Sequence, residues 1–155
     1  MFTLVHQPLA GCDESLAPIW LRCDRRTLAK RIWRGKADDG EEFGFELQQP
    51  MRHGDVVFQT AQWRYVIRQE PEPVLEIALD IAPCAAAGIG WAVGNLHLEL
   101  SAEVSRLLAP DEPAVRQLMA RLSVPYRCTT AIFRPGRFAR GQQAAQELGA
   151  SHRHA

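Results

Sequence analysis

The first half of the chain alternates apolar and polar positions at the spacing of short β-strands. Residues 43–47 read Phe-Gly-Phe-Glu-Leu, which predicts a half-buried strand. The turn signals Asp-Asp-Gly at 38–40 and His-Gly-Asp at 53–55 flank it, and a further apolar run begins at residue 56. We therefore expect a β-rich domain built from strands and turns between residues 20 and 69.

Strand and helix patterns alternate after residue 72. Strands are expected over residues 74–79, 96–100, 103–107 and 126–133. One helix should begin near Asp80 and stop at Gly94, and a second should follow residues 111–113 with an apolar stripe of Val115, Leu118, Met119 and Leu122. The resulting order βαββαβ predicts a ferredoxin-like domain, in which two helices pack on one antiparallel sheet.

Two prolines, Pro71 and Pro73, mark the expected boundary, since proline cannot donate a ladder hydrogen bond. The expected fold class is α+β, with a β-rich N-terminal domain over residues 1–71 and a ferredoxin-like metal-binding and dimerisation domain over 72–134. The polar segment 135–155 is expected to be a flexible tail, and it ends in two histidines, His152 and His154.

Composition restricts the classes of function. The formal net charge is zero and no apolar run approaches the roughly 20 residues needed to cross a bilayer. The N-terminus lacks the features of a secretory leader, so we expect a cytoplasmic protein that binds neither membrane nor nucleic acid. One segment departs from this balance, because residues 22–36 contain seven basic residues and one acidic residue. They form either a solvated face or a docking site for an acidic partner or phosphates.

Motifs typical of catalysis or of a structural zinc site are missing from the sequence, although Ser, His, Asp and Cys residues occur. The four cysteines form no C-x-x-C pair, and we expect Cys84 in a helix and Cys128 in a strand to be small apolar packing residues. No nucleophile elbow, Gly-rich phosphate loop or H-E-x-x-H motif occurs, so the sequence does not predict an enzyme.

The segment Gly94-Asn95-Leu96-His97 contains the strongest candidate for a metal ligand. On a strand over 96–100, His97 would share one face with Glu99 and point away from the leucines. His152 and His154, at the end of the chain, are candidates to complete the coordination of the same ion.

Several motifs together resemble the UreE-type urease accessory proteins, which are nickel metallochaperones. The likeness rests on Arg25-Arg26, on Asp39-Gly40 followed by residues 43–47, on Gly54-Asp55-Val56-Val57, on Glu72-Pro73-Val74-Leu75 and on Gly94-Asn95-Leu96-His97. The resemblance implies that His97 is the metal-binding histidine of a Gly-Asn-Arg-His motif and meets its copy from a second subunit across a twofold axis. It further implies a homodimer that carries Ni(II) as cargo and delivers it to apo-urease through the accessory GTPase and the urease activation complex.

The chain departs from the family pattern at specific positions. Leu96 replaces the motif's Arg, Asp111-Glu112 lacks the family's following His, Pro135-Gly136 replaces Pro-Glu, and the tail offers only two histidines. Imidazole also binds Zn(II) and Cu(II), and binds any metal only when neutral, so we expect loading to fail in acid. A role for Asp111 or Glu99 in assisting the metal stays open, as does pairing of dimers into a tetramer. The alternative function is a metal-independent interaction module that docks an acidic protein or RNA through residues 22–36.

Overall fold

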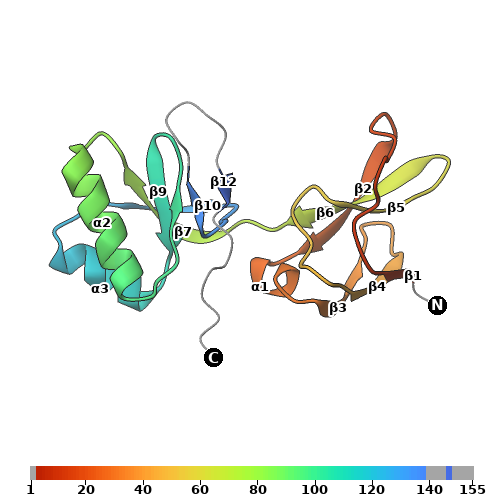
Figure 1. Cartoon of the computed structure of the whole chain (residues 1–155), viewed down its shortest axis with the longest axis horizontal. Coiled ribbons are helices and arrows are strands. Elements are labelled where there is room, and N and C mark those ends of the chain that lie inside the picture. The colour runs from red at the N-terminus through yellow and green to blue at the C-terminus, as the bar shows by residue number, and fades with distance from the viewer. Residues whose placement is uncertain (1–2, 139–145, 148–155) are drawn as a thin grey trace. The chain divides into compact units, whose positions relative to one another are not determined.

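The computed structural model describes residues 3–138 and 146–147 and has a mixed α+β fold, as the sequence predicts. The chain divides into two compact units, Met1–Glu70 and Pro71–Ala155, and each is described here by itself (Figure 1). Among the described helices, none is both long and apolar enough to span a bilayer.

The N-terminal unit consists of two three-stranded sheets. One has the order β1-β4-β3, with β1 parallel to β4, and the other has the order β2-β6-β5, with β2 parallel to β6. The only helix described in this unit is the single turn α1 (Arg25–Leu28), which is capped by the Asp24 carboxylate through the backbone amide of Thr27 at 2.9 Å. The strands are β1 (Thr3–Val5), β2 (Ala17–Cys23), β3 (Ile32–Lys36), β4 (Glu42–Glu46), β5 (Val56–Gln59) and β6 (Trp63–Gln69).

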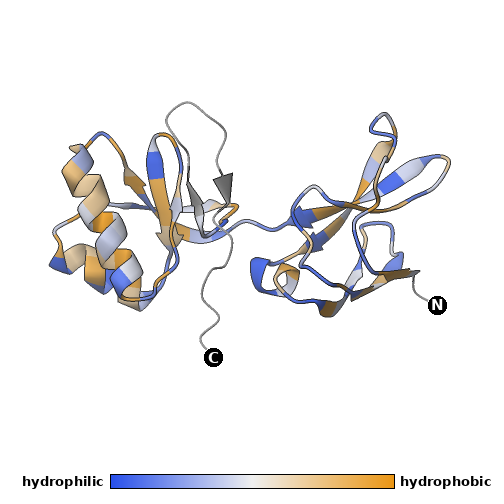
Figure 2. Ribbon diagram, in the orientation of Figure 1, coloured by the Kyte–Doolittle hydropathy of each residue, from blue (hydrophilic) through white to orange (hydrophobic). Residues whose placement is uncertain are grey.

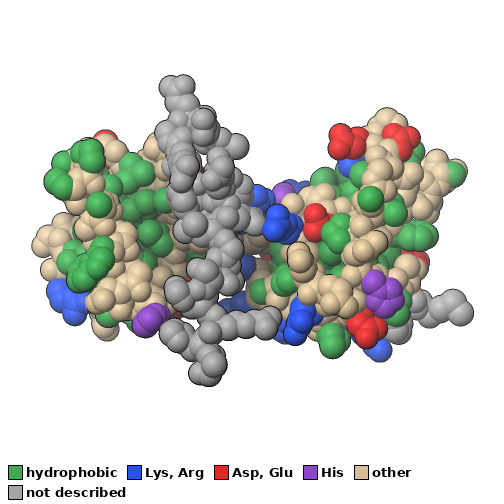
Figure 3. All heavy atoms as spheres, in the orientation of Figure 1, with side chains coloured by type: hydrophobic (Ala, Val, Ile, Leu, Met, Phe, Trp, Pro, Cys, Tyr) green, Lys and Arg blue, Asp and Glu red, His purple; other side chains and the backbone are tan. Residues whose placement is uncertain are grey.

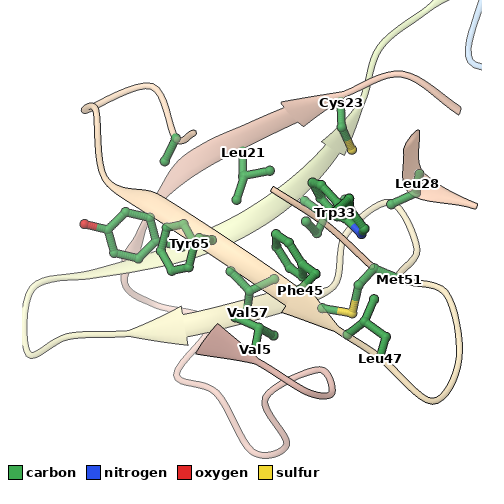
Figure 4. Close-up of a cluster of buried hydrophobic side chains, with 13 residues drawn as sticks. Val5, Leu21, Cys23, Leu28, Trp33, Phe45, Leu47, Met51, Val57 and Tyr65 are labelled. Carbon is green, nitrogen blue, oxygen red and sulfur yellow. The ribbon is translucent and has the colours of Figure 1, made fainter. Parts of the chain in front are cut away.

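Both sheets contribute side chains to one hydrophobic core (Figure 4). Trp33 of β3 stacks on Phe45 of β4 with ring centroids 3.8 Å apart. Leu21 of β2 and Ile67 of β6 are fully buried against this cluster. The predicted burial of Phe43 and Phe45 in β4 is confirmed, but Gly44 between them is buried as well, so the middle of the strand is covered on both faces.

The C-terminal unit contains a sheet with the order β10-β7-β9-β8-β11-β12. Its first four strands pair antiparallel with one another, whereas β8 is parallel to β11. Helices α2 and α3 cover one face of this sheet (Figure 1). Two short strands, which fall within the segment predicted as a tail, extend it beyond β8. The elements are β7 (Glu72–Ala78), α2 (Pro83–Asn95), β8 (Ser101–Ala102), β9 (Arg106–Pro110), α3 (Pro113–Arg121), β10 (Arg127–Ala131), β11 (Arg137–Phe138) and β12 (Gln146–Glu147).

Alternate residues of β7 build two apolar layers. Leu75 and Ile77 face the helices and belong to the larger core, which also contains Val93 of α2. Val74 points to the opposite face and packs with Leu108 and other buried side chains there. The colouring of Figure 2 shows these apolar positions along the strands of the sheet.

The strand predicted over residues 96–100 is wrong. Helix α2 continues through Gly94 to Asn95, the chain turns at Leu96 and His97, and the next strand is only Ser101–Ala102. A glycine can occupy a position inside a helix, so Gly94 does not end α2. The left-handed residue that follows the helix is His97, with a φ of 55°. Asp80 does not cap α2 either, because the N-cap is Ala82, which makes no side-chain capping bond.

Pro73 was wrongly predicted to interrupt strand pairing. It lies inside β7 opposite Thr130 of β10, and its carbonyl oxygen accepts a hydrogen bond from the Asp111 amide at 3.2 Å. Proline lacks a donor but keeps its acceptor, so it is compatible with the beginning of a strand. The prediction for Cys84 and Cys128 is also wrong, since both thiols are exposed and the buried cysteine is Cys23.

Candidate metal centre

His97 lies immediately beyond the C-terminal end of α2. Its amide donates a hydrogen bond to the carbonyl of Gly94 at 3.0 Å, and the amide of Leu98 donates to the carbonyl of Val93 at 3.1 Å. His97 has a φ of 55°, in the left-handed region. These two bonds and the left-handed residue define a Schellman motif, which usually has glycine where this chain has histidine.

Helix α3 ends in the same way. Ser123 has a φ of 53°, its amide donates to the Ala120 carbonyl at 3.1 Å, and the amide of Val124 donates to the Met119 carbonyl at 2.9 Å. The two helix ends therefore share one backbone arrangement, and each places a polar side chain at the left-handed position. The conformation of His97 is thus a property of the helix end and does not depend on a bound ion.

The outer face of α2 is apolar and exposed. The helix contains no charged residue between Pro83 and Asn95, and its buried side chains are Ile89 and Val93. On the opposite face the Trp91 side chain is 71% exposed. Leu96, next to the histidine, is 44% exposed. Hydrophobic side chains accordingly reach the surface over the helices of this unit (Figure 3). We call Cys84, Ala87, Gly88 and Trp91 the α2 outer face. Leu96 follows the helix, seven residues after the buried Ile89, and is not part of this face.

The His97 side chain is exposed, and the described residues of one chain do not complete a metal site around it. No group of three or more His, Cys, Asp or Glu residues with metal-binding geometry occurs within residues 3–138 and 146–147. His152 and His154 lie outside the described residues. Glu99 is exposed and already makes an interaction of its own.

Asp111 is held away from a metal role by an ion pair. Both of its carboxylate oxygens accept hydrogen bonds from the Arg116 guanidinium, at 2.5 and 2.9 Å. These bonds keep the pKa of Asp111 below its usual value. The carboxylate is charged, but its charge is matched by the arginine beside it.

The other two described histidines, His6 and His53, are each engaged in a hydrogen bond in the N-terminal unit. His6 Nδ1 lies 3.1 Å from the carbonyl oxygen of Glu46, and His53 Nδ1 accepts a hydrogen bond from the Gln69 amide at 3.1 Å. Each imidazole therefore has a local partner in the N-terminal unit.

A groove of about 720 Å³ lies elsewhere in the C-terminal unit, and His97 is not part of its lining. Its walls include Ile77, Ile81, Ala85, Ile89, Leu122 and Tyr126. The candidate centre is thus an exposed imidazole at a helix end, which suits exchange of an ion with another molecule better than reaction inside an enclosed pocket.

Sequence reasoning identified His97 but missed two features beside it. The α2 outer face was not predicted, although the absence of charge over thirteen consecutive residues is visible in the sequence. The left-handed conformation was missed because histidine at that position carries no signal comparable to glycine.

The basic segment 22–36 is partly neutralised in the structure. Arg22 makes a two-pronged ion pair with Asp38, with Nε–Oδ1 and Nη2–Oδ2 distances of 2.9 Å. Asp24 is engaged in capping α1. Arg25, Arg26 and Arg34 also make interactions of their own, and nothing among the described residues supports an interaction module built on this segment.

Comparison with known proteins places the chain in a family. The family model described as the UreE urease accessory protein, C-terminal domain, matches residues 72–155. The Urease accessory protein UreE of Geobacillus kaustophilus is 30% identical over 123 residues, which cover 78% of this chain and 81% of the relative. The proteins of the same name from Lysinibacillus sphaericus and Staphylococcus epidermidis are 25% and 30% identical over 118 and 101 residues, covering 74% and 64% of this chain and 78% and 67% of the relatives.

The matched region contains the whole βαββαβ segment and the His97 motif, and the longer alignments extend into the N-terminal unit. The chain belongs to the UreE family of urease accessory proteins.

Proposed function

We propose that this protein is a homodimeric, cytoplasmic nickel metallochaperone in which two copies of His97 hold one Ni(II) ion at the subunit interface. It delivers the ion to apo-urease through the accessory GTPase and the urease activation complex. Membership of the UreE family supports the accessory role, and the observation that carries the proposal is the exposed His97 at the end of an exposed, uncharged helix.

The need for a second chain follows from the ligand count. One imidazole is a weak site, and the described part of the chain brings no second or third metal-binding group to it. A twofold axis near His97 doubles the imidazoles without any further residue. The histidines of the tail, His152 and His154, would supply additional nitrogen ligands that can leave when the ion is transferred.

The α2 outer face is the proposed dimer interface. An exposed apolar helix face with a tryptophan at its centre is costly in water and typical of a protein interface. Trp91 lies on this face, and Leu96 precedes the histidine directly. A second copy covering the face would bring the two ends of α2, and with them the two imidazoles, toward a shared axis.

The chemistry suits a cargo ion. Nickel is a borderline divalent ion that accepts imidazole nitrogen, and an exposed site without thiolate ligands releases it more readily than a closed cysteine cage would. No cysteine lies within ten residues of His97 in the sequence, since the nearest is Cys84. Ligand exchange at the interface is therefore the proposed mechanism of delivery.

Calorimetric titration of nickel into the full chain tests the proposal. Wild type should bind one high-affinity ion per two chains, and His97→Asn, which preserves a left-handed backbone, should lose this binding. A chain truncated after Gly149 should retain binding with lower affinity. Unchanged high-affinity binding in His97→Asn would remove the proposed site, whereas an unchanged truncated chain would remove only the tail histidines from it.

A further inference from the structure

We propose that Leu98 is a positioning residue for the His97 imidazole, an inference that rests on the proposed metal-binding role of His97. Leu98 follows the histidine, and its amide closes the helix end by donating to the Val93 carbonyl at 3.1 Å. Its side chain is partly buried against the helix-side core, which contains the fully buried Val93. Leu96, on the other side of the histidine, is 44% exposed and does not anchor the chain to the core in this way.

The packing of Leu98 matters because His97 has an unfavourable, left-handed backbone conformation. The left-handed region is sterically unfavourable for a residue with a Cβ atom, so a released His97 would move to other backbone angles. The hydrophobic contact that follows a Schellman motif opposes this release. With Leu98 packed, the imidazole starts from one fixed backbone position, and binding an ion requires less ordering of the chain.

The two leucines that flank His97 therefore have different roles. Leu98 connects the helix end to the core of its own chain, whereas the side chain of Leu96 is exposed and makes no such connection. Truncation of Leu98 should weaken metal binding although it removes no ligand, and it should leave the outer face intact.

The end of α3 offers a matched control within the same unit. Val124 stands after Ser123 as Leu98 stands after His97, its amide donates to the Met119 carbonyl at 2.9 Å, and its side chain packs against the same core. Val124→Ala thus removes an equivalent contact from an equivalent helix end that carries no imidazole.

The experiment compares nickel affinity, by calorimetry on the full chain, for wild type, Leu98→Ala, Leu98→Met, Val124→Ala and His97→Asn. We expect Leu98→Ala to weaken nickel binding about tenfold, the lower end of what loss of an outer-shell partner costs a metal site. Leu98→Met should restore affinity to within about twofold of wild type, and Val124→Ala should bind as wild type does. Hydrogen exchange at the amides of His97 and Leu98 should accelerate in Leu98→Ala alone.

Leu98→Val serves as a milder truncation if the alanine variant does not fold, and it should give a smaller loss in the same direction. An equal loss of nickel affinity in Leu98→Ala and Val124→Ala would overturn the inference, because it would reflect general destabilisation. Wild-type affinity in both Leu98→Ala and Leu98→Val would also overturn it. Retained affinity in His97→Asn would instead refute the proposed function, so the two failures are distinguishable.

Discussion

The amide nitrogen of His97 lies 3.0 Å from the carbonyl oxygen of Gly94, and this hydrogen bond fixes the histidine two residues beyond Asn95, the last residue of α2. The same bond joins Ser123 to Ala120 at the end of α3. The protein thus uses one helix-ending device twice, and at one of the two ends it presents a side chain able to bind metal.

Replacement of His97 by glycine should separate stability from metal binding. Glycine adopts the left-handed conformation without steric cost, so His97→Gly should raise the free energy of unfolding by about 0.5–1 kcal/mol while nickel binding is lost. Ser123→Gly should give a similar gain in stability with nickel binding intact. Urea unfolding and calorimetry on both variants measure the two effects, and a destabilised His97→Gly would show that the histidine makes contacts beyond its backbone role.

The α2 outer face should control association. A charge at its centre, in Trp91→Glu, should weaken dimer formation at least tenfold, since buried aromatic residues dominate interface energies. Trp63, which is 43% exposed in the N-terminal unit, provides the control Trp63→Glu. Sedimentation equilibrium should show monomers for Trp91→Glu at concentrations where wild type and the control are dimeric. A dimer that survives Trp91→Glu would place the interface elsewhere.

Gly35 should be intolerant of a side chain. A Cβ atom at this position would lie 2.8 Å from Cδ2 of Leu21 and 2.8 Å from Cζ3 of Trp33, inside the core of the N-terminal unit. Overpacking of this kind typically costs about 1–3 kcal/mol, which is the destabilisation expected for Gly35→Ala. Hydrogen exchange should become faster in strands β2 to β6 and stay unchanged in β7 and β9. Equal effects in both units would contradict a local origin.

Acid should weaken the C-terminal unit through Glu76. Its carboxylate accepts hydrogen bonds from Arg106 at 2.8 Å and from Arg127 at 2.6 Å, and these bonds, led by that from Arg106, hold its pKa below the usual 4.5. The ion pairs of Glu76 with the two arginines therefore stabilise the fold above about pH 4.5. This contribution disappears as the pH falls through the lower pKa that Glu76 has in the folded protein.

The urea midpoint of this unit should accordingly decrease as the pH is lowered from 5 to 2. Glu76→Gln should make this dependence of the midpoint on pH less steep. Glu14 is exposed and has no ion-pair partner among the described residues, so Glu14→Gln should leave the slope as it is in wild type. Identical slopes for wild type and Glu76→Gln would show that other groups determine acid sensitivity.

The sequence predicted the fold class and most elements because their patterns are local. The predicted burial of Phe43 and Phe45 in β4 and of Val115, Leu118 and Met119 in α3 is confirmed. The prediction for Leu122, the fourth member of the stripe, was wrong, because it follows the last residue of α3 and is 41% exposed. The prolines at 71 and 73 predict a boundary between domains in this part of the chain, and the two compact units divide between Glu70 and Pro71.

The errors cluster where local signals conflict with packing. Gly94 has the character of a helix stop, but α2 continues to Asn95, and the left-handed residue that follows the helix is His97, three residues after Gly94. Val93 keeps this last turn buried against the core. Leu96, Leu98 and Leu100 alternate with polar residues as in a strand. Only Leu98 and Leu100 pack against the core, and both lie in the irregular segment between α2 and β8. The choice of His97 as a candidate ligand therefore came from the motif, and the strand geometry first assigned to it was wrong.

The exposed state of the α2 outer face could not be read from composition. An Ala-rich, uncharged helix predicts burial, and the sequence does not indicate whether the burying surface belongs to the same chain or to another. In the described part of one chain, Trp91 and Cys84 are left uncovered, which is the physical basis for expecting a second copy.

A crystal structure of the nickel-loaded full chain, with the ion located by anomalous scattering, tests the shared site most directly. The account predicts one nickel peak on a twofold axis, bonded to an imidazole nitrogen of His97 from each of two chains. A nickel ion bound within a single chain and away from His97, or two His97 side chains on opposite sides of the assembly, would contradict it.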